Sequence, residues 1–338
     1  MSSGNKRSRD NTQAHFSDTA APASVPGRRS KGIIVSQGCK LAWGCQSVIG
    51  GRRYQENSYI AARQLPDGSK LFGVFDGHGG SHVSSFLELN VESYISTAIK
   101  LHDKQLPISW KSTFTTAFTS LDEDLRPSEP QNNDSATTTD NGGSTAVIVR
   151  LSESEIVCAN CGDSRAVLSR SGEVRALSMD QNPDREDEES RIKTAGGTIL
   201  HNHGARRVMG VLNMTRAIGD NWLRRFGVIP EPEVWVLDRL QYDDEFIIVA
   251  SDGLWVAIDN EEAVNITRRS LRQASLKGLG SDSAARIAAK VLTRAALAKG
   301  STDNITVIVI DLQAEITPLI IQQQIALEAT GLKISSSS

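Results

Sequence analysis

Residues 71–80 read Leu71-Phe72-Gly73-Val74-Phe75-Asp76-Gly77-His78-Gly79-Gly80, an apolar run followed by an acid and three glycines around a histidine. The large apolar residues before Asp76 predict a buried strand bounded by a turn. This strand would deliver Asp76 to a sheet edge, where the glycines let the backbone pass close to a bound group. A carboxylate, a free backbone carbonyl and His78 at one strand end form a candidate metal and acid–base site.

Two further acids are joined to unusually apolar strands. Asp252 follows the apolar run 246–250, and Asp303 comes just before the apolar run 305–310. In antiparallel neighbours the start of one strand lies beside the end of the other, so Asp76, Asp252 and Asp303 are expected to meet at one edge. A single Asp-Gly usually marks a turn, but three acids on three such strands favour a shared site.

A second polar group follows the glycine turn at Gly50 and Gly51. Arg52 and Glu56 precede another short apolar segment that begins near Ser58. A guanidinium group matches phosphate geometrically, so one interpretation is an anion-binding arginine beside a metal-binding carboxylate. The other interpretation is a surface hairpin with an ion pair.

The composition is that of a globular protein. The 338 residues are 39% hydrophobic and 23% charged, and the net charge of −3 creates no global field that favours nucleic acid or an anionic membrane. No apolar run approaches the roughly 18 residues needed to cross a bilayer, and residues 1–10 lack the apolar core of a signal peptide. We therefore expect a cytoplasmic or nuclear monomer with no nucleic-acid or membrane partner.

The four cysteines fit a reducing compartment. Cys158 and Cys161 form a C-x-x-C pair, a pattern found in metal-binding and redox-active sites. Both lie in a predicted strand, where positions three apart point to opposite faces. Two separately packed thiols are therefore the favoured interpretation.

The two ends of the chain differ from its centre. Residues 1–32 are rich in Ser, Ala, Arg and Asn without periodicity, which predicts a disordered tail. Basic clusters at 6–9 and 28–31 would act as a nuclear address or an anionic contact, or they are simply solvated. The folded domain is expected at 33–313, followed by a partly helical C-terminal tail at 314–338.

The order of predicted elements indicates the fold class. Apolar spacing predicts helices at 81–100, 109–125, 187–195, 263–271 and 284–298. Strands are predicted at 41–48, 71–75, 142–149, 158–168, 174–177, 207–220, 233–236, 246–250 and 305–312. This order is neither a βαβ alternation nor a repeat array. It predicts an α+β protein with helix-flanked antiparallel sheets, in which the last strand returns beside an early one.

Eight motifs occur in the order that one protein family shows. They are Arg52-x-x-x-Glu56, Val74-Phe75-Asp76-Gly77-His78-Gly79-Gly80, Gly143-Ser144-Thr145-Ala146, Asn160-Cys161-Gly162-Asp163-Ser164-Arg165, Glu188-x-x-Arg191-Ile192, Thr215-Arg216-Ala217-Ile218-Gly219-Asp220, Ser251-Asp252-Gly253-Leu254-Trp255 and Ser301-x-Asp303-Asn304. On these motifs the chain resembles the metal-dependent protein phosphatases of type 2C, from about residue 44 to 312. The resemblance implies a four-layer αββα sandwich, two antiparallel sheets flanked by helix pairs.

The resemblance also implies a two-metal centre. Asp76 would bridge two Mg²⁺ or Mn²⁺ ions, and Asp252 and Asp303 would complete one of them. Glu56 and the Gly77 carbonyl would hold the other ion, with water in the remaining positions. Oxygen ligands and retained water are what these ions prefer.

The implied reaction is hydrolysis of phosphoserine and phosphothreonine in phosphoprotein substrates. A water that bridges the two ions would attack phosphorus. Arg52 would orient the phosphoryl oxygens, and His78 would protonate the departing oxygen.

Two positions depart from the family pattern. Asn57 stands where the family usually has an acid that holds metal-bound water, and the amide lacks the charge. Val256 stands where an acid usually helps Asp163 and Asp252 to hold a third ion, and valine cannot ligate. The expected function is a working phosphatase, and the alternatives are a catalytically silent relative that binds phosphoproteins or scaffolds a partner, and a phosphatase of a non-protein phosphate.

Overall fold

Two five-stranded antiparallel sheets dominate the computed structural model, which describes residues 41–102, 108–126, 142–202 and 204–314. The first sheet has the strand order β1 (Ala42–Val48), β15 (Ile305–Asp311), β14 (Asp244–Ala250), β8 (Arg165–Arg170) and β9 (Glu173–Ala176). The second has the order β13 (Glu233–Asp238), β7 (Glu155–Cys161), β6 (Ala146–Leu151), β3 (Lys70–Phe75) and β2 (Ser58–Gln64). The last strand lies between β1 and β14, which confirms that it returns beside an early strand.

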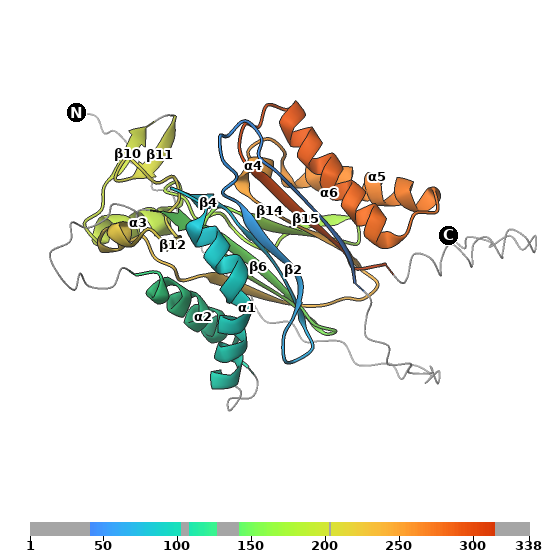
Figure 1. The fold of residues 1–338 in the computed structure, drawn as a ribbon, viewed down its shortest axis with the longest axis horizontal. Coiled ribbons are helices and arrows are strands. Elements are labelled where there is room, and N and C mark those ends of the chain that lie inside the picture. The colour runs from blue at the N-terminus through green and yellow to red at the C-terminus, as the bar shows by residue number, and fades with distance from the viewer. Residues whose placement is uncertain (1–40, 103–107, 127–141, 203, 315–338) are drawn as a thin grey trace, which may run out of the picture. The chain divides into compact units, whose positions relative to one another are not determined.

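A pair of helices covers the outer face of each sheet (Figure 1). The pair on the second sheet is α1 (His82–His102) and α2 (Trp110–Asp124), and the pair on the first sheet is α5 (Asn260–Leu276) and α6 (Ser281–Ala298). Separate apolar clusters fill the space between each helix pair and its sheet, and a third cluster fills the space between the sheets. The predicted four-layer αββα sandwich is therefore confirmed.

Strand β3 is buried on both faces, and this explains its unbroken apolar run. Phe72 and Val74 pack between the two sheets, whereas Leu71 and Phe75 belong to the cluster under α1 and α2. Alternate residues of a strand face opposite ways, so a strand in the middle of four layers needs apolar residues at every position.

Helix α6 lies close to strand β1 because the residues between them are small. Five alanines lie on the buried face of α6, namely Ala284, Ala285, Ala288, Ala289 and Ala296. A Cβ atom added at Gly44 of β1 would collide with the backbone of Arg286, so this strand requires glycine there. The close approach holds β1 and the helix pair as one unit.

Several short elements lie outside the main sheets. Three two-residue strands form a small sheet in the order β12 (Ile218–Gly219), β5 (Gly143–Ser144) and β4 (Gly77–His78). Strands β10 (Ile199–Asn202) and β11 (Ala205–Val208) form a separate hairpin. The remaining elements are α3 (Glu186–Thr194), α4 (Asp252–Trp255) and the 3-10 helix η1 (Asn221–Phe226).

The predicted strand at 207–220 is wrong. Strand β11 ends at Val208, because Met209 and Gly210 adopt φ angles of 52° and 73° and turn the chain back on itself. Val208 then pairs with Leu212 in an isolated bridge. Only the two residues of β12 follow as strand, so this stretch is mostly irregular.

The expectation that three acids share one sheet edge is correct only for two of them. Ala250 of β14 pairs with Val307 of β15, which brings Asp252 and Asp303 to the same end of the first sheet. Asp76 follows β3, and β3 belongs to the second sheet. An apolar strand that is buried on both faces has the same sequence pattern in either sheet. The sequence therefore could not show whether the strand before Asp76 belongs to the first sheet or the second.

The chain crosses from the second sheet to the first at Gly162, between β7 and β8. Gly162 has a φ of 110°, and a Cβ atom there would lie 2.7 Å from Cγ2 of Thr145. Asp163 comes directly after this crossing. The predicted strand at 158–168 is therefore interrupted at 162–164, between the end of β7 and the start of β8.

Both cysteines of the C-x-x-C pair are buried, free thiols. Cys158 packs between the sheets, and Cys161 belongs to the cluster under the helices. Burial raises the pKa of the Cys161 thiol to about 12 and that of Cys158 higher still. The prediction of two separately packed thiols is confirmed.

The predicted tail at 1–32, and all of the predicted tail at 314–338 except its first residue, lie outside the described residues. Within the described ranges, no helix is long and apolar enough to cross a membrane.

A buried ion network fixes α3 to the segment that leads into β12. Glu188 is fully buried and accepts hydrogen bonds from Arg191 at 2.6 and 2.7 Å, from Arg216 at 2.6 and 3.0 Å, and from the Thr215 hydroxyl. Burial alone would raise the pKa of Glu188, but these donors outweigh it and lower the pKa to about 2.

We expect Glu188→Gln to lower the free energy of unfolding at pH 7 by about 3–5 kcal/mol, because two arginines lose their buried partner. Since the folded-state pKa lies below the usual 4.5, wild-type Glu188 loses its contribution as the pH falls from 4.5 towards 2. Urea unfolding at pH 7 and pH 3 measures both effects. Glu186→Gln, on the exposed side of the same helix, is the control, and equal losses in the two variants would contradict the network's role.

Candidate functional site

All the residues that the sequence suggested for the site line one cavity of about 600 Å³. They are Arg52, Glu56, Asp76, Gly77, His78, Asp163, Asp252 and Asp303. The acids follow β3, β7 and β14 or precede β2 and β15, so both main sheets contribute to the same cavity. Segments that are more than 200 residues apart in the chain therefore meet at this end of the sandwich.

The acids in the cavity repel one another. Burial raises the pKa of Asp76 well above its ordinary value, and the neighbouring charges of Asp252, Asp163 and Asp303 raise it further. The pKa of Asp163 and that of Asp252 are raised for the same first reason, burial. The protein thus holds a cluster of carboxylates whose charge calls for compensation by protons or cations.

The donor set fits divalent cations. The side-chain donors are hard carboxylate oxygens, which suit Mg²⁺ and Mn²⁺. Oδ1 of Asp163 is buried and has no hydrogen-bond partner, so one strong acceptor has spare capacity. Burial and the neighbouring Asp252 both raise the pKa of Asp76, so a proton or a cation bound beside this pair is favourable.

The tightest acidic cluster among the described residues lies elsewhere. Asp187, Glu188 and Glu233 have carboxylate oxygens within 4.8 Å of one another. Arg185 and Arg216, among other arginines, already pair with these acids, so the cluster is structural. Among the described residues, the cavity acids do not form a group as tight as this one.

The loop that carries Glu56 is fastened to the start of β15 by Asn304. The Asn304 amide accepts a hydrogen bond from the Glu56 backbone N–H at 2.8 Å and donates to the carbonyls of Ile49 and Tyr54 at 2.8 and 3.0 Å. A Cβ atom at Gly77 would collide with the Glu56 carbonyl. Asn304 had no assigned role in the sequence, although it stands beside Asp303 in a family motif.

Arg52 forms an ion pair with Asp303, with 2.6 Å between Nη2 and Oδ2. The sequence left open an ion pair within a surface hairpin, but the observed partner is 251 residues away. The Asp303 carboxylate raises the pKa of Arg52. The Arg52 side chain is 60% exposed, so it lines the cavity and stays accessible to an anion from solution.

The sequence did not identify the partner of His78. Nε2 of His78 lies 2.7 Å from Oδ2 of Asp220, a buried residue with a φ of 48°. A Cβ atom at Gly143, in the strand between them, would collide with the Asp220 carboxylate. The carboxylate accepts the Nε2 hydrogen, which orients the imidazole and leaves Nδ1 for proton exchange.

The two positions that depart from the family pattern differ in their surroundings. Asn57 is nearly buried, and neither atom of its amide has a hydrogen-bond partner. Val256 is 72% exposed and lines a second cavity, of about 420 Å³, together with Asp163 and Asp252. Asn213 donates to Oδ2 of Asp163 at 3.2 Å, so an amide satisfies part of this acid.

We expect Asp76→Asn to raise the melting temperature of the metal-free protein by a few degrees at pH 7.5, because it removes a buried, repelled charge. The pKa of Asp76 is raised, so protonation restores wild-type stability as the pH falls and the difference narrows. Differential scanning fluorimetry in EDTA measures this, with the exposed Asp184→Asn as control. Added Mn²⁺ should stabilise the wild type far more than Asp76→Asn, and a lower melting temperature for Asp76→Asn in EDTA would contradict the interpretation.

Solved structures with this fold are similar in three dimensions but distant in sequence. A Caenorhabditis elegans sex determining protein superposes with a TM-score of 0.70 at 24% identity, covering 80% of this chain and 65% of that one. A serine-threonine phosphatase 2C from Toxoplasma gondii gives a TM-score of 0.64 at 23% identity, covering 80% of this chain and 94% of the other. These likenesses support the fold alone.

Sequence relatives are closer. Protein phosphatase 2C 50 of Oryza sativa subsp. japonica is 38% identical, over 87% of both chains. Protein phosphatase 2C 7 of Arabidopsis thaliana is 36% identical over 82% of this chain, which spans 63% of that relative's length. The family model described as Protein phosphatase 2C matches residues 46–305. The chain belongs to the protein phosphatase 2C family.

Proposed function

We propose that the protein is a metal-dependent serine/threonine phosphatase that hydrolyses phosphoserine and phosphothreonine in proteins. The observation that supports this most strongly is one cavity in which acids from both sheets face Arg52 and the His78–Asp220 pair. Membership of the protein phosphatase 2C family supports phosphoproteins as the substrate class.

Five groups would hold two Mg²⁺ or Mn²⁺ ions. These are the carboxylates of Glu56, Asp76, Asp252 and Asp303 and the backbone carbonyl of Gly77. When bound, the ions would activate water as a nucleophile and withdraw charge from the phosphoryl group. The protein's own contribution is to hold the acids together before any ligand arrives, as the raised pKa of Asp76 reflects.

Arg52 would bind the phosphoryl group. Its ion pair with Asp303 positions the guanidinium at the cavity, and its exposure lets the side chain turn towards an incoming anion. Two parallel N–H donors match two phosphoryl oxygens, so Arg52 would orient the phosphorus for attack.

His78 would transfer a proton to the departing serine or threonine oxygen. An alkoxide is a poor leaving group, so protonation in the transition state accelerates this step. Asp220 fixes the ring through Nε2 and stabilises the charged imidazolium before transfer. Asp220 acts through His78, and we assign it as a positioning residue.

The departures at Asn57 and Val256 would tune the reaction rather than abolish it. The five groups that would hold the two ions are present, and Asn57 still offers an acceptor oxygen for water. Val256 removes an acid next to Asp163 and Asp252, where a third ion would otherwise bind. The case for a silent, phosphoprotein-binding relative depends on these two positions.

The decisive experiment is dephosphorylation of a phosphothreonine peptide with increasing Mn²⁺, alongside calorimetric titration of Mn²⁺. We expect metal-dependent turnover that falls by at least about 100-fold in Asp76→Asn, since the ions contribute several kcal/mol to the barrier. Metal binding without turnover, up to millimolar Mn²⁺, would overturn the proposal in favour of the binding protein.

We expect His78→Gln to reduce turnover of phosphothreonine peptides by about 10²–10⁴-fold. Turnover of p-nitrophenyl phosphate should fall far less, because its phenolate leaves without a proton. Asp220→Asn should show the same selectivity with a smaller loss, and asparagine tolerates the left-handed φ of this position.

The double variant separates positioning from an independent role. If Asp220 acts only through His78, His78→Gln/Asp220→Asn is no slower than His78→Gln alone. Multiplicative losses, or equal losses on the alkyl and aryl substrates, would contradict the assignment.

A further inference from the structure

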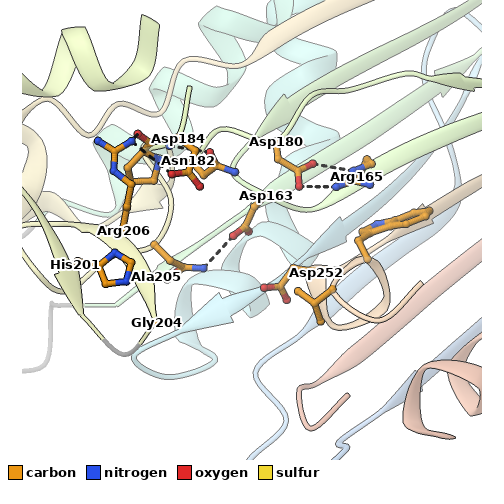
Figure 2. A pocket seen from close by; sticks show the side chains of 14 residues that line it. Asp163, Arg165, Asp180, Asn182, Asp184, His201, Gly204, Ala205, Arg206 and Asp252 are labelled. Carbon is orange, nitrogen blue, oxygen red and sulfur yellow. Dashed lines mark hydrogen bonds and ion pairs between the residues drawn. The ribbon is translucent and has the colours of Figure 1, made fainter. Parts of the chain in front are cut away.

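The second cavity, of about 420 Å³ (Figure 2), shares lining residues with the catalytic cavity. Asp163, Asn213 and Asp252 line both cavities, so they form the boundary between them. The hairpin of β10 and β11 contributes one wall of the second cavity, and Trp255 and Val256 of the α4 region contribute another. A peptide with its phosphoryl group in the catalytic cavity would therefore place a neighbouring side chain here.

The charges that line the second cavity do not balance. Its two arginines are already paired. Arg165 binds Asp180 through two hydrogen bonds of 2.9 and 2.7 Å, and Arg206 binds Glu189 at 2.5 Å. Asp184 receives only a long contact of 3.5 Å from Arg206, and its side chain is 71% exposed at the rim.

Asp163 provides a strong and unused acceptor inside the cavity. The residue is 92% buried, since only 8% of its surface is exposed. Asn213 satisfies Oδ2 at 3.2 Å, but Oδ1 has no hydrogen-bond partner. Figure 2 shows Asp163 between the hairpin residues His201 and Arg206 on one side and Asp252 on the other. A buried carboxylate oxygen without a donor is costly, and a cationic group would relieve it.

Apolar side chains also line this cavity, although Trp255 is only 7% exposed and its ring faces Arg165. Val256 is 72% exposed, and Trp255 next to it also lines the cavity. Lysine and arginine have an aliphatic stem that packs on apolar side chains and a charged end that extends beyond them. The combination of an exposed apolar side chain and an acidic interior matches both parts of a basic side chain.

We propose that the second cavity is a specificity subsite for a lysine or arginine side chain close to the phosphorylated residue of the substrate. The stem would pack on Val256, and the cationic group would bind Asp163 with Asp184 at the rim. This inference rests on the proposed phosphatase function and adds the substrate class. It gives Val256 a role of its own, because an acid at this position would place a third carboxylate where the stem lies.

The experiment uses the full chain with Mn²⁺ and matched phosphothreonine peptides. Each peptide carries one arginine, placed in turn at positions −3 to +3, and its partner carries citrulline, a neutral residue of the same shape. We expect kcat/KM to be about tenfold higher for arginine at the best position, the size of one charge-assisted hydrogen bond. Added salt should reduce the preference.

Two variants test the subsite without touching the proposed catalytic groups. Val256→Lys fills the cavity with a tethered cation, and we expect it to reduce the arginine preference to less than about twofold, because the acceptor is already occupied. Val256→Gln is the neutral control of similar length and should keep the preference. Asp184→Asn should reduce it partly. Hydrolysis of p-nitrophenyl phosphate, which has no flanking residue, should be unchanged in Asp184→Asn. For the two Val256 variants, the ratio of arginine to citrulline turnover cancels any change in the basal rate.

The outcomes separate the subsite from the proposed function. Turnover that is equal for arginine and citrulline at every position overturns the subsite but leaves the phosphatase intact. An arginine preference that persists in Val256→Lys also overturns the subsite. So does a divalent ion bound by Asp163, if no arginine preference is seen at any Mn²⁺ concentration. If no peptide is hydrolysed, fluorescence anisotropy of the same pairs tests the subsite, and equal dissociation constants overturn it.

Discussion

Mutual repulsion among the carboxylates crowded into one cavity is the constraint on which the arrangement of this protein depends. Asp76, Asp252 and Asp303 follow or precede strands of two different sheets, so the sheets must be packed rigidly for the acids to stay together. The apolar cluster between the sheets and the helices on both outer faces supply that rigidity. The free energy of packing thus offsets the electrostatic repulsion among these acids, which persists until a cation binds.

Hydrogen bonds between distant segments also hold individual residues of the site in place. The Glu56 loop and the His78 ring are each held by a polar residue from a distant part of the chain. Asn304 fastens the loop of Glu56, and Asp220 orients His78. Glu188 in turn anchors the segment that leads to Asp220 through two arginines. These contacts join residues that are far apart in the sequence, so the sequence alone does not reveal which residues hold the site in place.

Much of the fold and most of the cavity could be predicted from the sequence, for identifiable reasons. Strands buried on both faces leave a continuous apolar run, and the acids beside those runs were correctly expected at strand ends. The sheet to which each run belongs leaves no mark, so Asp76 was assigned to the wrong edge. The left-handed turn at Met209 and the partner of Arg52, Asp303, depend on tertiary contacts and were missed.

The residues at the Gly162 crossing and those of the β10–β11 hairpin differ in how freely their sequence can change. Gly162 joins the two sheets and fits against Thr145 without room for a side chain, so Asp163 is fixed from both sides. The hairpin of β10 and β11 pairs only with itself among the named strands. Its exposed residues 200–202 are therefore free to change during evolution at little cost to folding, and relatives with the same chemistry can acquire different targets.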